Sequence, residues 1–195
     1  MSELPPLGAI LAGGASRRMG EDKALVDLAG RPMIAYVAAA LESAGCRVAA
    51  IGRSDHPAGV ASVNDSPSGK RGPVAGLATA LRIAGGAPVV LVGVDQPFLR
   101  ASTVERMLSL TGGDAVVPVA AGRRQATCAV FWPNCDAIVA DLLGGSSDPS
   151  LQAVLDRVPL REVADDEWRR WGEDGDSWWS VDTPEALSVA RGRLA

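Results

Sequence analysis

Short apolar segments alternate with segments of helical periodicity along this chain, and this alternation constrains the fold more than any other feature. Apolar runs such as 89–94 are typical of strands that are covered on both faces. Strands that alternate with helical patterns predict βαβ units, and therefore an α/β protein with a mostly parallel sheet between helices. We expect strands at 7–11, 48–51, 60–63, 89–94, 115–119 and 126–132, and helices at 32–43, 73–84, 134–143, 149–158 and 183–193, with one more helix opening at a Ser102–Glu105 capping box.

The size and charge of the chain restrict its class. With 195 residues, 47% of them hydrophobic, we expect residues 1–195 to form a single domain. The formal net charge of −4 argues against non-specific binding to nucleic acid or to a membrane surface. We see no signal peptide and no apolar run near the ~20 residues of a membrane span, so we expect a cytoplasmic protein. The three cysteines are widely spaced, which predicts buried thiols rather than a metal site: Cys46, Cys128 and Cys135.

A glycine-rich segment directly follows the first expected strand. Residues 11–23 read L-A-G-G-A-S-R-R-M-G-E-D-K. Ligands of parallel sheets bind outside the carboxyl ends of the strands, where glycines let backbone amides approach an anion and basic side chains add charge. A surface turn with solvated charges would have the same composition, and the segment lacks both the G-x-G-x-x-G pattern and a P-loop. The residues alone leave these two interpretations open.

The complete string, followed by G-R-P-M at 30–33, closely resembles the signature of nucleotidyltransferases with a Rossmann-like fold. Within that superfamily it most resembles the molybdenum cofactor guanylyltransferase family. The resemblance implies a Rossmann-like three-layer αβα sandwich. It also implies that GMP is transferred from GTP to molybdopterin, with release of pyrophosphate and formation of the guanine dinucleotide cofactor. Molybdoenzyme apo-proteins or chaperones would receive the product.

Three later motifs recur in the order that this family shows. They are Asp65 followed by G-P-V-A-G at 72–76, Asp95-Gln96-Pro97, and Asp182-Thr183-Pro184-Glu185. In the family they line the base and ribose, hold the metal ion, and face the metal or the acceptor phosphate, respectively. Without the resemblance, a helix start at residue 72 and a turn residue at Asp95 would explain the first two motifs equally well.

The resemblance assigns a role to each matching residue. Arg18 and Lys23 would offset charge on the triphosphate and the departing pyrophosphate, and Asp95 with Asp182 would position Mg²⁺ across the α-phosphate and the acceptor. The expected catalytic residues are Arg18, Lys23 and Asp95. The expected nucleotide-binding residues are Leu11, Ala12, Gly13, Gly14, Lys23, Asp65, Gly72, Gly76 and Asp95.

Several features bear on specificity. Gly13 favours guanine, because a methyl group there would crowd a purine that lies on the backbone. Ser180 and Asp182 stand where guanylyltransferases often carry asparagine, which leaves acceptor binding open. The alternatives are a cytidylyltransferase or sugar-phosphate nucleotidyltransferase of the same fold, and a nucleotide-binding homologue without catalysis. Four tryptophans near the C-terminus form either a local aromatic cluster or a stacking surface for a pterin: Trp168, Trp171, Trp178 and Trp179.

Overall fold

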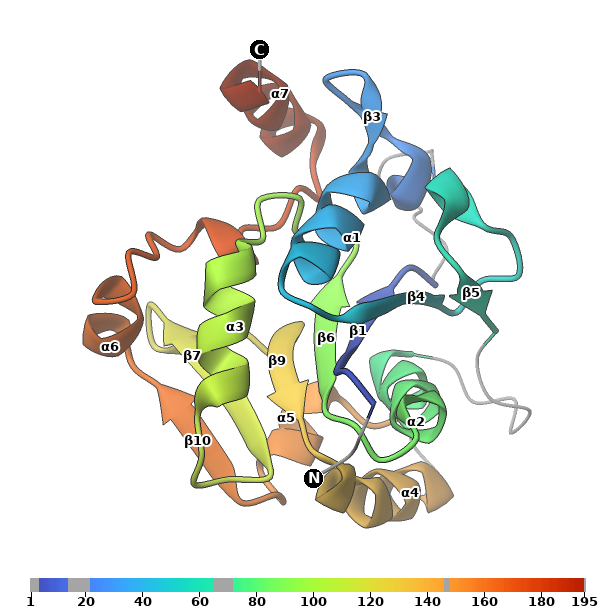
Figure 1. Ribbon diagram of the computed structural model, residues 1–195, viewed down its shortest axis with the longest axis vertical. Coiled ribbons are helices and arrows are strands. Elements are labelled where there is room, and N and C mark those ends of the chain that lie inside the picture. The colour runs from blue at the N-terminus through green and yellow to red at the C-terminus, as the bar shows by residue number, and fades with distance from the viewer. Residues whose placement is uncertain (1–3, 14–21, 65–71, 146–147, 195) are drawn as a thin grey trace.

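In the computed structural model, the alternation along the chain becomes a central sheet between two layers of helices (Figure 1). The structure describes residues 4–13, 22–64, 72–145 and 148–194. The strands of the sheet run in the order β10-β7-β9-β6-β1-β4-β5, and β8 pairs with β7. Their bounds are β1 (Leu7–Leu11), β4 (Arg47–Ile51), β5 (Ser62–Val63), β6 (Val89–Gly93), β7 (Ala115–Ala120), β8 (Arg123–Arg124), β9 (Cys128–Phe131) and β10 (Leu160–Val163).

The sheet is mostly parallel, as predicted, with one reversed strand. Strand β1 pairs in parallel with β4 and β6, whereas β9 runs antiparallel to both of its neighbours, β6 and β7. A parallel connection needs a crossover of a dozen or more residues, but no helix separates β7, β8 and β9. The chain instead reverses tightly at Ala121 and Gly122, whose φ angles are 49° and 71°. Because no helix connects β7 to β9, β9 runs antiparallel to its neighbours.

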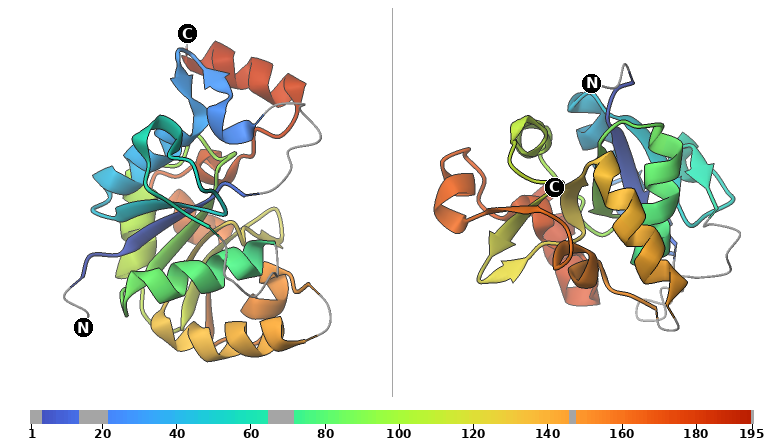
Figure 2. Two further views of the ribbon diagram at one scale, coloured as in Figure 1. Left: turned by 90° about the vertical axis from the view of Figure 1, so that its right-hand side faces the viewer. Right: turned by 90° about the horizontal axis from the view of Figure 1, so that it is seen from below.

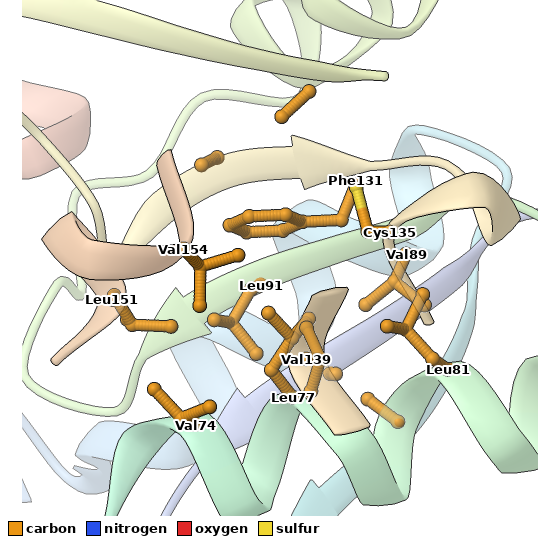
Figure 3. Close-up of a cluster of buried hydrophobic side chains, with 14 of the residues drawn as sticks. Val74, Leu77, Leu81, Val89, Leu91, Phe131, Cys135, Val139, Leu151 and Val154 are labelled. Carbon is orange, nitrogen blue, oxygen red and sulfur yellow. The ribbon is translucent and has the colours of Figure 1, made fainter. Parts of the chain in front are cut away.

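Helices cover both faces of the sheet, which confirms the predicted sandwich (Figure 2). Alternate residues of β1 and β6 enter opposite cores, because successive side chains of a strand point to opposite faces. Leu91 packs in the core beneath α2, α4 and α5, shown in Figure 3, and Val92 packs in the core beneath α1, α3 and α6. The helix bounds are α1 (Met33–Ser43), α2 (Pro73–Ala84), α3 (Ala101–Ser109), α4 (Asp136–Gly144), α5 (Leu151–Leu155), α6 (Asp165–Arg169) and α7 (Pro184–Leu194). None of the described helices has the length and apolar character needed to cross a membrane.

Three expected helix starts are wrong. Helix α4 begins at Asp136 rather than at 134, because a 3₁₀ turn at Pro133–Cys135 precedes it. Helix α3 begins at Ala101, so Ser102 lies inside it, and its N-cap Arg100 makes no side-chain capping hydrogen bond. The backbone amide of Arg100 instead donates to the Ser177 hydroxyl at 3.0 Å. Helix α5 is shorter than the expected 149–158, since Ser150 caps it by accepting a hydrogen bond from the amide of Ala153 at 3.2 Å. Tertiary contacts and a nearer cap thus override the sequence signals.

A third, smaller core joins residues 26–36 to the C-terminal segment beside the sheet. Helix α7 packs against the hairpin of β2 (Asp27–Leu28) and β3 (Arg31–Pro32), and both lie together at the top of Figure 1. Leu28 and Val181 are fully buried in this core, and Tyr36 donates a hydrogen bond to the carbonyl of Leu28 at 2.7 Å. The core therefore fixes the C-terminal motif close to the segment that follows the glycine-rich motif.

Candidate active site

The carboxyl ends of the central strands bring several expected site residues to one edge of the sheet. Leu11 at the end of β1 is in register with Ile51 of β4 and with Gly93 of β6. Ala12 and Gly13 follow β1, and Asp95 follows β6. Three other expected residues lie outside the described part of the chain: Gly14, Arg18 and Asp65.

Asp95 and Lys23 meet at this edge although 72 residues separate them in the sequence. The ammonium Nζ of Lys23 lies 3.2 Å from Oδ2 of Asp95. The hydroxyl of Ser180 donates to the same oxygen at 2.9 Å. The side chains of Lys23 and Asp95 keep 21% and 25% of their surface exposed, so both remain accessible to a ligand. A cation and a hydroxyl thus converge on one partly exposed carboxylate.

A tight turn after β6 orients Asp95. Gln96 is 2% exposed, and its Oε1 accepts a hydrogen bond from the amide of Gly93 at 3.0 Å while its Nε2 donates to the Thr127 hydroxyl at 3.4 Å. A Cβ atom on Gly93 would lie 2.6 Å from Oδ1 of Asp95, so a side chain there would push the carboxylate out of its present position. Gln96 was not predicted as a site residue, although it lies within the D-Q-P motif that follows the buried strand.

The C-terminal motif reaches the same turn. The amide of Val181 donates to the backbone carbonyl of Asp95 at 2.7 Å, and Ser180 binds the Asp95 side chain. Asp182 follows directly and is partly buried. Within the described residues, no group of three or more His, Cys, Asp or Glu side chains could hold a metal ion. Asp95 still suits Mg²⁺, which takes one or two protein carboxylates and completes its shell with water and substrate phosphates.

Known proteins resemble this chain over most of its length. The family model described as the MobA-like NTP transferase domain matches residues 8–163. The chain belongs to this family. A protein named molybdenum cofactor guanylyltransferase from Xanthomonas euvesicatoria pv. vesicatoria is 39% identical over 54% of each chain. A probable molybdenum cofactor guanylyltransferase from Pelotomaculum thermopropionicum is 30% identical over 96% of this chain and 93% of its own.

A solved structure confirms that the MobA-like fold extends along the chain. Molybdopterin-guanine dinucleotide biosynthesis protein A from Archaeoglobus fulgidus superposes with a TM-score of 0.81. The match covers 96% of this chain and 98% of that one, at 21% identity. The Rossmann-like sandwich that the motifs implied is therefore the fold of this family member.

Two glycines of the MobA-like motifs are explained by packing. A Cβ atom on Gly13 would lie 2.9 Å from the Cα atom of Gly52, so the end of β1 can approach the end of β4 only without a side chain. A Cβ atom on Gly76 would lie 2.6 Å from Leu11, and this glycine lets α2 pack closely on β1. The backbone of Gly52 already excludes a methyl group at position 13, so the presence of Gly13 does not by itself indicate a preference for guanine.

Gly72 differs from these two glycines. It precedes α2 with a φ of 103°, a conformation that favours glycine, and a Cβ atom there would meet no atom of the described residues within 4 Å. The first amides of α2 have no side-chain cap, as the free N-terminus of an anion-binding helix requires. Gly72 thus has a role in the backbone conformation before α2.

The tryptophan cluster of this MobA-like domain is structural. Trp168 and Trp178 are 2% and 8% exposed, and their rings pack edge to face with centroids 5.0 Å apart. Trp179 packs against Phe98 with centroids 5.4 Å apart and lies beneath the guanidinium of Arg193. The tryptophans therefore pack in two different cores, and these contacts favour packing within the protein over a surface that stacks on a pterin.

The cysteines and the described cavity lie apart from the chemistry. The predicted buried thiols are confirmed, and burial raises the pKa of Cys46 to about 11 and that of Cys128 to about 12, so both stay protonated at neutral pH. A cavity of about 390 Å³ opens between α2 and α4, where it is lined by Arg82 and Asp136 among others. It lies at the end of α2 that is remote from Gly72.

Proposed function

We propose that this protein transfers GMP from GTP to molybdopterin, releasing pyrophosphate and forming the guanine dinucleotide cofactor. The names of its full-length relatives support the reaction. The observation that carries the proposal is the convergence of Lys23 and Ser180 on Asp95 at the carboxyl ends of the central strands. A cation beside a partly exposed carboxylate is what a metal-dependent reaction of a triphosphate needs.

Each residue has a part in the proposed reaction. Lys23, together with Arg18, neutralises the triphosphate and the departing pyrophosphate. Asp95, helped by Asp182, would hold Mg²⁺, which would supply Lewis-acid chemistry to the phosphoryl transfer. The backbone of Ala12 and Gly13 follows β1 beside this carboxylate, where the nucleotide binds with help from Leu11, Gly14, Asp65, Gly72 and Gly76. The acceptor phosphate attacks the α-phosphorus and pyrophosphate leaves, so positioning and charge neutralisation suffice without a protein nucleophile.

The test is pyrophosphate release with each nucleoside triphosphate, Mg²⁺ and molybdopterin. Among the nucleoside triphosphates, we expect only GTP to give pyrophosphate release. The rate of release should fall at least 100-fold in Asp95→Asn. The matched control is Asp136→Asn, an exposed carboxylate on α4 at the cavity remote from Gly72, which should stay within twofold of the wild type. Equal turnover of CTP, or turnover with a sugar phosphate alone, would refute the assignment.

The biological setting belongs to the same proposal. We expect residues 1–195 to act as a single nucleotidyltransferase domain in the cytoplasm. Molybdoenzyme apo-proteins or their chaperones would take the product, and neither nucleic acid nor a membrane would be a partner. The net charge of −4 is consistent with this choice, because phosphate is recognised locally rather than by a broad basic surface.

A further inference from the structure

Arg53, which lies just beyond β4, bridges two carboxylates beside the candidate site. Its Nε and Nη2 atoms donate to Asp55 at 2.8 and 2.6 Å. Its Nη1 atom donates to Oδ1 of Asp22 at 2.8 Å, and Nη2 lies 2.7 Å from Oδ2 of the same residue. Only 11% of the Arg53 side chain is exposed. The planar guanidinium is thus held by two carboxylates, an arrangement that lysine could not reproduce.

Asp22 passes this restraint to Lys23. Its Oδ1 atom accepts a hydrogen bond from the amide of Ala24 at 3.1 Å and so caps the short 3₁₀ helix η1 (Lys23–Leu25). Its backbone carbonyl accepts a further hydrogen bond from the amide of Leu25 at 2.9 Å. Lys23 therefore begins a single helical turn whose cap is held by Arg53, and its ammonium reaches Asp95 from that turn.

The backbone that precedes Arg53 is hydrogen-bonded to the sheet. The amide of Gly52 donates to the carbonyl of Val63 at 2.9 Å, and the amide of Ala12 donates to the carbonyl of Ile51 at 3.1 Å. Gly13 packs against the backbone of Gly52. One continuous set of contacts therefore runs from β4 through Arg53, Asp22 and η1 to Lys23.

The charges of this cluster persist at neutral pH. The Arg53 hydrogen bond lowers the pKa of Asp22, and the same guanidinium lowers the pKa of Asp55. Hydrogen bonds to both carboxylates raise the pKa of Arg53 above its ordinary value. Two carboxylates against one guanidinium leave the cluster net negative, which disfavours direct binding of phosphate by Arg53.

We propose that Arg53 is a positioning residue for Lys23: acting through Asp22, it holds η1 so that the ammonium of Lys23 meets Asp95, and it does not touch the substrate. The catalytic consequence rests on the proposed function, whereas the hold on η1 does not. The rival explanation is that Arg53 binds the nucleotide itself.

Two measurements test this role on the full chain, and the first needs no substrate. Arg53→Met should speed hydrogen exchange of the backbone amides of η1 at least tenfold, and Asp22→Asn should do the same. Arg53→Lys should increase the exchange rate by an intermediate amount, since lysine keeps the charge but lacks the planar guanidinium that bridges two carboxylates. The control is Arg161→Met, which removes another paired arginine, bound to Glu167 at 2.6 and 2.7 Å on the edge strand β10, and should leave η1 unchanged. Unchanged exchange in Arg53→Met would overturn the proposal.

The second measurement separates positioning from direct contact. Arg53→Met should lower kcat about tenfold and change KM for GTP less than threefold, and in a Lys23→Met background it should add almost nothing. A rise in KM for GTP that persists in the Lys23→Met background would overturn the proposal, because Arg53 would then contact the nucleotide. If the wild type transfers no GMP, the proposed function fails, while hydrogen exchange still decides whether Arg53 holds η1.

Discussion

The ion pair between Lys23 and Asp95 should compete with a divalent metal for the same carboxylate. In the structure, the Lys23 ammonium lies 3.2 Å from Oδ2 of Asp95. A metal that binds Asp95 in the absence of nucleotide must weaken this pair, whereas a bound triphosphate offers Lys23 a new partner. We therefore predict that Lys23→Met binds metal more tightly than the wild type when no nucleotide is present, and binds GTP more weakly.

The magnitude follows from the exposure of the pair. Because the two side chains are 21% and 25% exposed, solvent screens their attraction, and such pairs contribute up to about 1 kcal/mol. A change of about 1.4 kcal/mol corresponds to a factor of ten, so removing the pair should increase metal affinity by up to about fivefold. The loss of GTP affinity should be of similar size or larger, since a charge-assisted contact to phosphate disappears.

Mn²⁺ is a suitable probe, because the free ion can be counted by electron paramagnetic resonance. We would titrate the nucleotide-free wild type, Lys23→Met, Asp95→Asn and the control Arg82→Met. The control removes one positive charge at the cavity remote from Gly72 and should leave Mn²⁺ affinity unchanged. Tighter binding in Lys23→Met together with loss of binding in Asp95→Asn is the expected pattern. Equal affinity in Lys23→Met and the wild type would refute the competition, and unchanged binding in Asp95→Asn would remove Asp95 from the metal site.

Three further substitutions test the site and its support. Ser180→Ala removes a 2.9 Å hydrogen bond to Asp95 and should lower kcat three- to tenfold, with recovery in Ser180→Thr; steady-state kinetics that stay unchanged would contradict this. Gly13→Ala places a Cβ atom 2.9 Å from the Cα atom of Gly52 and should cost about 1–3 kcal/mol in urea unfolding, a result that unaltered stability would exclude. Trp179→Ala should lower the melting temperature without changing KM for the acceptor, whereas a raised KM would restore the stacking hypothesis.

The fold was predictable wherever a segment is buried on both sides. The apolar run at 89–94 predicts the central strand β6, because a strand that lies between two helical layers needs apolar side chains at every position. Strand β10 (Leu160–Val163) lies at the edge and is mostly only half buried, so its L-R-E-V sequence lacks both an apolar run and a clear alternation. Helix α6 and the β2–β3 hairpin were missed for a related reason, since each is too short to show a period.

The sequence predicted which strand ends form the candidate site, but not which side chains contact one another there. Lys23 and Asp95 were expected at the site, and the structure brings them together. Gln96 and Arg53 were not among the expected site residues. Their roles depend on hydrogen bonds between segments far apart in the sequence, from Arg53 to Asp22 and from Gln96 to Thr127, each across 31 residues. Local spacing contains no information about such partners.

The structure also separates two constraints that a motif combines. Gly13 and Gly76 belong to the segments that mark the family, yet each occupies a place where a Cβ atom would collide with Gly52 or Leu11. Asp22, inside the same signature, faces Arg53 and the amide of Ala24. A motif residue can therefore be required because it brings two strands together or holds the neighbour that binds the ligand. Under the proposed function, Lys23 takes part in the chemistry and the residues around it support its position. Substitutions at the supporting positions should therefore alter stability or the placement of Lys23 before they alter nucleotide choice.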